Sequence, residues 1–250
     1  MKNQKTAIEA IEKHGALLVF PVDNRKEPLS IWSCFYPRSP MRWEWDEDGD
    51  NRVAGLWHLR ADLSTTKKVV YVKWYQGRAT YLSRPLFTAM LRALNPEREV
   101  ERPLSPMARR ILSILDGESP LSTKELKRIA ELKGKDNEAQ FNRAMKELWS
   151  RLLIVAFGEV DDGAFPSLAV GSTRVLFEDL WSQAFKLERQ DALKKVSSIL
   201  PAKNPFAQFF VKLLKQLTVA SGAARAKQAD SQPERSHAPR AASVVRFEDL

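Results

Sequence analysis

The chain has 250 residues, of which 44% are hydrophobic and 28% are charged, and its formal net charge is +9. This composition is typical of one large or two small globular domains, and the positive charge favours a polyanionic partner without specifying a fold. A single cysteine, Cys34, excludes an intramolecular disulfide and any metal site built from several cysteines. No apolar run is long enough to span a membrane, so we expect a cytoplasmic protein without membrane contact.

Residues 1–100 predict a small mixed α+β unit. Its expected elements are an amphipathic helix at 5–14 that ends at Gly15, a buried strand at 16–22, a segment at 29–37 that fits a helical turn and a strand equally well, a β-hairpin at 69–83, and a helix at 85–94. Asn95-Pro96 ends the last helix, because the residue before a proline avoids helical geometry. The charged residues that follow predict a linker.

Residues 101–185 predict a winged helix, in which three short helices precede a two-stranded hairpin, the wing. The expected elements are helices at 106–116, 123–130 and 137–150, and strands at 152–160 and 168–180. Ser122 or Thr123 can cap the second helix, and Glu125 is placed to close a capping box. The expected fold class is therefore α+β: a small mixed N-terminal unit, then this winged helix, then a basic helical extension.

The third of these helices carries side chains that suit DNA contact. Together the second and third helices offer six candidates for DNA contact: Lys124, Lys127, Gln140, Arg143, Lys146 and Ser150. A major groove accepts one helix, in which Gln140 can pair with adenine, Arg143 with guanine, and Lys146 with phosphate. Glu147, on the same outer side, opposes phosphate binding. The alternative is the ordinary polar face of an amphipathic helix, or a surface for protein partners, because residues 101–160 hold 11 Lys or Arg against 9 Asp or Glu.

The C-terminal part predicts a basic helical extension at 186–218. Residues 181–217 contain 7 Lys or Arg against 2 Asp or Glu, on two amphipathic helical patterns. We expect Lys194 and Lys195 to contact the DNA backbone, since clustered positive charge attracts phosphate.

A flexible tail is expected at 219–250. Residues 219–243 contain no bulky apolar side chain apart from Val219, so they cannot bury enough surface to offset chain entropy. The last four residues, Phe247-Glu248-Asp249-Leu250, repeat residues 177–180. This repeat is either chance or a segment that docks where its copy lies, in the same molecule or in a second one, which would give self-association.

Two tryptophans flank an acidic residue in Trp43-Glu44-Trp45-Asp46. Indole rings can stack on a base, and Glu44 or Asp46 could then handle a proton in base excision. The alternative is structural, with both tryptophans pinning a loop onto the sheet. No phosphate loop, zinc motif or nucleophile elbow occurs, so we expect no cofactor and no metal.

Several modest motifs occur in an order that resembles a known family. They are Leu17-Leu-Val-Phe-Pro, Trp32, Trp43-Glu-Trp-Asp, Tyr71-Val-Lys, Gly77-Arg-Ala-Thr-Tyr-Leu-Ser, Ala108-Arg-Arg-Ile and Phe141-Asn-Arg-Ala-Met-Lys-Glu-Leu. Over residues 15–185 the chain resembles the small bacterial proteins classified as AlkZ-related. Those proteins are similar to part of the winged-helix DNA glycosylases that unhook interstrand crosslinks.

The resemblance implies a winged-helix protein that binds double-stranded DNA, associates with the nucleoid, and works in DNA repair or in nucleoid or transcriptional processes. The catalytic signature of the glycosylases is Gln-x-Gln or Gln-x-Asp, and none of Gln76, Gln140, Gln183, Gln190 and Gln208 begins one. We therefore expect no catalysis. The alternatives are a glycosylase-like base-excision enzyme and a winged helix that binds protein.

Overall fold

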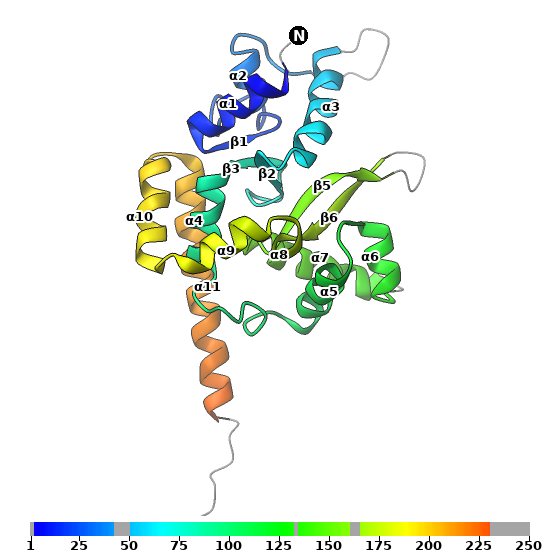
Figure 1. Cartoon of the computed structure of the whole chain (residues 1–250), viewed down its shortest axis with the longest axis vertical. Coiled ribbons are helices and arrows are strands. Elements are labelled where there is room, and N and C mark those ends of the chain that lie inside the picture. The colour runs from blue at the N-terminus through cyan, green and yellow to red at the C-terminus, as the bar shows by residue number, and fades with distance from the viewer. Residues whose placement is uncertain (1–2, 43–50, 133–134, 161–165, 231–250) are drawn as a thin grey trace, which may run out of the picture.

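The computed structural model describes residues 3–42, 51–132, 135–160 and 166–230. It combines helices with one antiparallel sheet of strand order β1-β3-β2-β5-β6-β4 (Figure 1). The elements are α1 (Gln4–His14), β1 (Ala16–Leu18), α2 (Ile31–Phe35), α3 (Asn51–Thr65), β2 (Val69–Val72), β3 (Thr80–Ser83), α4 (Arg84–Leu94), α5 (Pro106–Gly117), β4 (Leu121–Ser122), α6 (Thr123–Ile129), α7 (Lys135–Ser150), β5 (Ile154–Val160), β6 (Ser167–Ser172), α8 (Thr173–Leu176), α9 (Glu178–Lys186), α10 (Arg189–Ile199) and α11 (Pro205–Asp230). No described helix is both long and apolar enough to cross a membrane.

The sheet is continuous from the N-terminal strands to the last hairpin. β2 and β3 form the predicted hairpin, and β1 adds to β3. Tyr71 of β2 pairs with Ala156 of β5, which joins the two halves of the chain in one sheet. All residues of β1, β2 and β3 are buried, as expected for apolar strands covered by helices.

The three helices predicted between residues 106 and 150 are present as α5, α6 and α7. Between α5 and α6 lies the short strand β4, which pairs with β6, and β6 pairs with β5. Ser105 caps α5, and the Ser122 Oγ caps α6 by accepting from the Glu125 N–H at 3.1 Å. The element order α5-β4-α6-α7-β5-β6 thus ends in a hairpin.

The second strand of this hairpin is shorter than predicted. β6 ends at Ser172, and the chain turns into α8 and α9 where the sequence predicts a strand to residue 180. The Thr173 hydroxyl donates to the Leu152 carbonyl at 2.7 Å and fixes this change of direction. Leu176, Leu180 and Ala184 are buried at a spacing of four, which is the period of a helix.

The N-terminal part also contains helices that the sequence left open or did not indicate. The ambiguous segment 29–37 forms helix α2, whose cap Ser30 exchanges hydrogen bonds with Ser33 in a capping box. Helix α3 was not predicted. It buries Val53, Leu56 and Leu63 along one side, but an arginine interrupts this apolar stripe.

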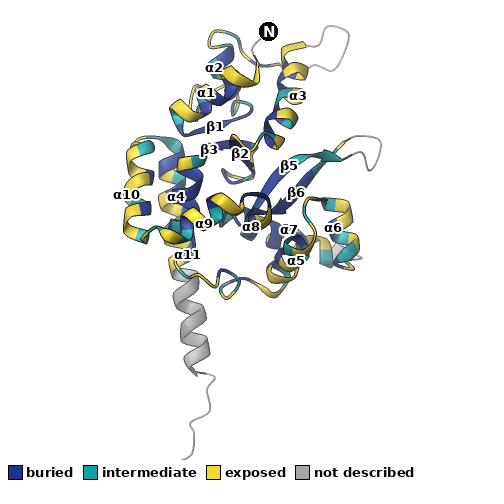
Figure 2. Ribbon diagram, in the orientation of Figure 1, coloured by how far each residue is buried: buried dark blue, intermediate teal, exposed yellow. Residues whose placement is uncertain are grey.

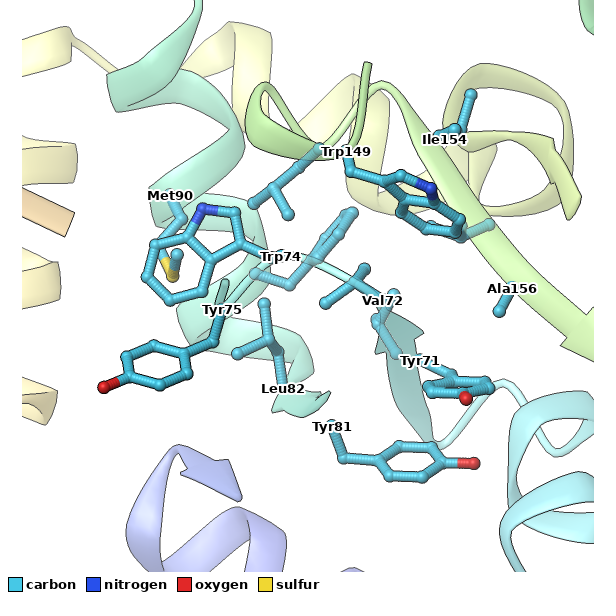
Figure 3. Close-up of a cluster of buried hydrophobic side chains, with 14 of the residues drawn as sticks. Tyr71, Val72, Trp74, Tyr75, Tyr81, Leu82, Met90, Trp149, Ile154 and Ala156 are labelled. Carbon is cyan, nitrogen blue, oxygen red and sulfur yellow. The ribbon is translucent and has the colours of Figure 1, made fainter. Parts of the chain in front are cut away.

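Helix α4 is the centre of the C-terminal layer, and Figure 2 shows it mostly buried. Helices α9, α10 and α11 contact it, so the basic extension is part of the folded body. α11 is anchored by aromatic rings: Phe209 lies 4.9 Å from Trp74 and 5.0 Å from Tyr75, measured between ring centroids. Figure 3 shows the Trp74 and Tyr75 side chains on the same side of the view as Met90 of α4.

α11 runs on to Asp230 and projects beyond the body of the protein (Figure 1). It therefore includes residues 219–230, for which the sequence predicts disorder. Five alanines lie in this stretch, and alanine has the highest helix propensity of any residue, so a helix can form here without bulky apolar groups.

Candidate nucleic-acid interface

Helix α7 presents a polar face at the surface. Gln140, Arg143 and Lys146 are exposed, and Ser150 is half-buried. The opposite face packs toward α5 and β5 through Phe141, Ala144, Met145, Leu148 and Trp149. The polar residues recur at a spacing of three or four, so they lie along one side of the helix. This row can face a long anionic surface without disturbing the core.

Helix α6 contributes Lys124, which is exposed. Lys127 is engaged within the protein, because its Nζ lies 2.6 Å from Glu138 Oε1 and 5.0 Å from the centroid of the Phe141 ring. The ion pair and the cation–π contact join α6 to α7. Lys127 therefore orients α7, and less of its charge is available to a phosphate than the sequence suggests.

Glu147 is turned away from the polar face and toward the start of α5. Its carboxylate accepts hydrogen bonds from the Ser105 hydroxyl at 2.7 Å and from the Ser105 backbone N–H at 3.2 Å. Negative charge is favoured at the N-terminus of a helix. The Glu147 carboxylate therefore has partners within the protein, at the start of α5, and keeps its negative charge.

The β5–β6 hairpin is attached to α3 by a bulge. The strand register shifts between Ala156 and Glu159, and Gly158 in the bulge has φ +76°, a conformation that favours glycine. The Gly158 N–H donates to Ser64 Oγ on α3 at 2.8 Å. The Glu159 carboxylate pairs with the Arg60 guanidinium. These contacts fix the direction in which the hairpin leaves the sheet.

Arg60 is only 6% exposed and is surrounded by polar and aromatic groups. Its Nη1 donates to Tyr71 Oη at 3.3 Å, and its guanidinium carbon lies 4.1 Å from the centroid of the Trp57 ring. The Tyr81 hydroxyl donates to the Arg60 carbonyl, and the Tyr71 and Tyr81 rings are stacked with centroids 5.0 Å apart (Figure 3). Burial lowers the pKa of Arg60, but Tyr71 and Glu159 raise it, and the net shift is upward.

The neighbouring titratable groups respond to the same burial. Burial raises the pKa of Tyr71 and raises that of Tyr81 well above its usual value, so both remain neutral phenols at neutral pH. Burial, with the nearby charge of Arg60, lowers the pKa of Lys73. The cluster therefore contains two cations in a poorly hydrated region, and Glu159 is the carboxylate that pairs with Arg60.

Sequence reasoning missed this cluster, although α3 carries a signal for it. Val53, Leu56, Arg60 and Leu63 follow one another at spacings of three, four and three. Arg60 therefore occupies a position on the apolar stripe of an amphipathic helix. A charged residue on the apolar stripe of a helix predicts a buried partner of opposite charge. Which residue is the partner could not be read from the sequence near Arg60.

The two basic side chains predicted in the extension lie on another surface. Lys194 and Lys195 on α10 are exposed, and Lys194 Nζ lies 3.2 Å from Asp191 Oδ1. Lys195 makes no ion pair with any described residue. In Figure 1, α10 lies at the left edge and α6 at the right edge, so the predicted residues form two separate groups.

Other predicted residues fall outside the described ranges. Trp43, Glu44, Trp45 and Asp46 belong to residues 43–50, and the repeated Phe247–Leu250 segment belongs to residues 231–250. Within the described residues, no group of three or more His, Cys, Asp or Glu is placed to hold a metal ion.

Comparison with known proteins identifies a family. Residues 1–214 match the family model described as AlkZ related. No curated protein and no solved structure matches the chain. The sequence also contains Gln228-Ala229-Asp230, which fits the Gln-x-Asp pattern but lies beyond the matched residues.

Proposed function

The chain belongs to the AlkZ-related family, and from this premise we propose that it is a winged-helix protein that binds double-stranded DNA without catalysis. The name of the family connects it to DNA repair, and we place the protein there or in nucleoid or transcriptional work. As a DNA-binding protein it would associate with the nucleoid.

The order of elements supports the winged-helix assignment. Three helices with a short strand after the first are followed by a hairpin, and the short strand β4 pairs with β6, the outer strand of that hairpin. In a winged helix the third helix enters the major groove and the hairpin lies beside it. α7 and the β5–β6 hairpin hold these positions in the chain.

The observation that carries the proposal is the exposed row of Gln140, Arg143 and Lys146 on α7. These side chains can hydrogen-bond to base edges or phosphates. The Glu147 carboxylate is hydrogen-bonded to Ser105 at the start of α5, so it does not cap the side chains of the row. Lys194 and Lys195 would add phosphate contacts from α10.

A salt titration of binding to a random-sequence duplex tests the proposal. Arg143→Ala/Lys146→Ala should weaken binding roughly tenfold or more at low salt, and should reduce the slope of log K against log salt by about 1, because the lost phosphate contact of Lys146 removes about 0.9. Lys5→Ala/Lys26→Ala removes two exposed cations elsewhere and is the control. Absence of binding at low salt, or equal binding by the two double variants, would overturn it.

Excision assays separate the competing enzymatic function. If the wild-type protein released a modified base, and Glu44→Gln or Asp46→Asn abolished the release, the protein would be a glycosylase-like enzyme. Capture of a protein partner from nuclease-treated lysate, without any DNA affinity, would instead indicate a protein-binding winged helix.

A further inference from the structure

We propose that a pocket between α1, α4, α9 and α10 binds a phosphate group. Its polar lining consists of Glu12, Lys68, Arg84, Thr88, Gln183 and Lys195, and its volume is about 350 Å³. This space can hold a phosphate together with part of the molecule that carries it. The pocket is separate from the exposed face of α7.

Three cations meet at this pocket from segments that are far apart in the sequence. Lys68 precedes β2, Arg84 is the first residue of α4, and Lys195 lies on α10. Lys68 and Lys195 are exposed, and neither forms an ion pair with any described residue. Like charges that converge repel one another, so a bound anion would lower the free energy of the site.

The carboxylates near the pocket only partly offset this charge. Arg84 pairs with Asp179 and donates to the Lys67 carbonyl at 2.6 Å, which holds its guanidinium in place. Glu12 also lines the pocket. Three positive against two negative side chains leave one net positive charge, and the two unpaired lysines can move toward a ligand.

The start of α4 adds to the positive potential. This helix has 11 residues, and its N-cap, Ser83, makes no capping hydrogen bond through its side chain. The N-terminal end of a helix carries a partial positive charge and favours phosphate. The helix end and the three cations therefore act in the same direction.

The identity of the phosphate carrier rests on the proposed function. A backbone phosphate of DNA and a terminal phosphate of a DNA strand share the chemistry that this pocket recognises. Either would make the surface of α10 a second contact with DNA, in addition to α7.

Titration of the full-length protein with inorganic phosphate, followed by amide NMR spectra, tests the pocket without DNA. We expect saturable shifts for Lys68, Arg84 and Lys195, and at least tenfold weaker binding by Lys68→Gln/Lys195→Gln. Both lysines are exposed, so the variant should fold, which its spectrum will show. Lys5→Gln/Lys26→Gln is the charge-matched control. Shifts that do not saturate, or equal affinity in both double variants, would overturn the proposal.

Duplexes with and without a 5′-phosphate identify the source. A gain in affinity from the 5′-phosphate that the Lys68→Gln/Lys195→Gln variant loses indicates a strand end. Equal binding of both duplexes, with a salt slope lowered by about 2 in the variant, indicates the backbone. If the wild type binds phosphate, but the Lys68→Gln/Lys195→Gln variant binds both duplexes with the affinity of the wild type, DNA is not the carrier of the phosphate. The DNA-binding function is tested independently by Arg143→Ala/Lys146→Ala.

Discussion

Replacing Glu159 by glutamine removes one charge from a pair whose other member has little access to water. The Arg60 side chain is 7% exposed and that of Glu159 is 16% exposed. Glutamine has nearly the same size and keeps one acceptor oxygen, so packing is retained while the charge is lost. Arg60 stays a cation, because arginine is not deprotonated in proteins.

The cost can be estimated from the surroundings of Arg60. Removing one partner of a fully buried ion pair costs about 3–5 kcal/mol. Here Tyr71 still accepts a hydrogen bond from Arg60, and the Trp57 ring still faces the guanidinium. Water also reaches the partly exposed Glu159. We therefore expect a loss of about 2 kcal/mol in the free energy of unfolding, and a Tm lower by roughly 4–8 °C.

Urea unfolding of the wild type, Glu159→Gln, Arg60→Met and the double variant measures this cost. Arg60→Met/Glu159→Gln should recover much of the loss, because no uncompensated charge remains buried. A coupling energy of at least about 1 kcal/mol is expected. If Glu159→Gln lies within about 0.5 kcal/mol of the wild type and the coupling is near zero, the charge of Arg60 is solvated and the reasoning is wrong.

Two further substitutions follow from the same region. Because the pKa of Lys73 is lowered from 10.5 in the folded protein, its charge destabilises the fold at neutral pH, and this penalty disappears as the pH rises through the folded pKa toward 10.5. Lys73→Met should therefore raise the free energy of unfolding at pH 7 by about 0.5–1 kcal/mol; an advantage that does not shrink with rising pH would contradict this. Gly158→Ala places a Cβ 3.2 Å from Thr65 Cγ2 at φ +76° and should cost about 1–3 kcal/mol. Gly77→Ala, at φ +74° in open space, is the matched control, and equal losses would show that Thr65 yields.

Local periodicity was enough to predict several helices and the first hairpin. In α5, Ala108, Ile111, Leu112 and Leu115 repeat with the helical period and are all buried. The same reasoning failed for residues 173–180, because a short segment of mixed apolar and charged residues fits the end of a strand and a helix alike until its neighbours are known. Periodicity also did not predict α3, because an arginine interrupts the apolar stripe of that helix.

Sequence by itself determined which side chains form the polar row on α7 for which we propose DNA contact. The polar row on α7 depends only on helical spacing, since a helix fixes the relative directions of residues three and four apart. Its exposure followed from the apolar residues on the other side of the helix.

Only the tertiary structure decided which charges are engaged. Lys127 is held by Glu138, Glu147 by Ser105, and Arg60 pairs with a residue 99 positions away. The convergence of Lys68, Arg84 and Lys195 likewise depends on how α4 and α10 pack. Such contacts depend on long-range packing of the whole chain, whereas a pattern in the sequence reports only neighbours along one helix or strand.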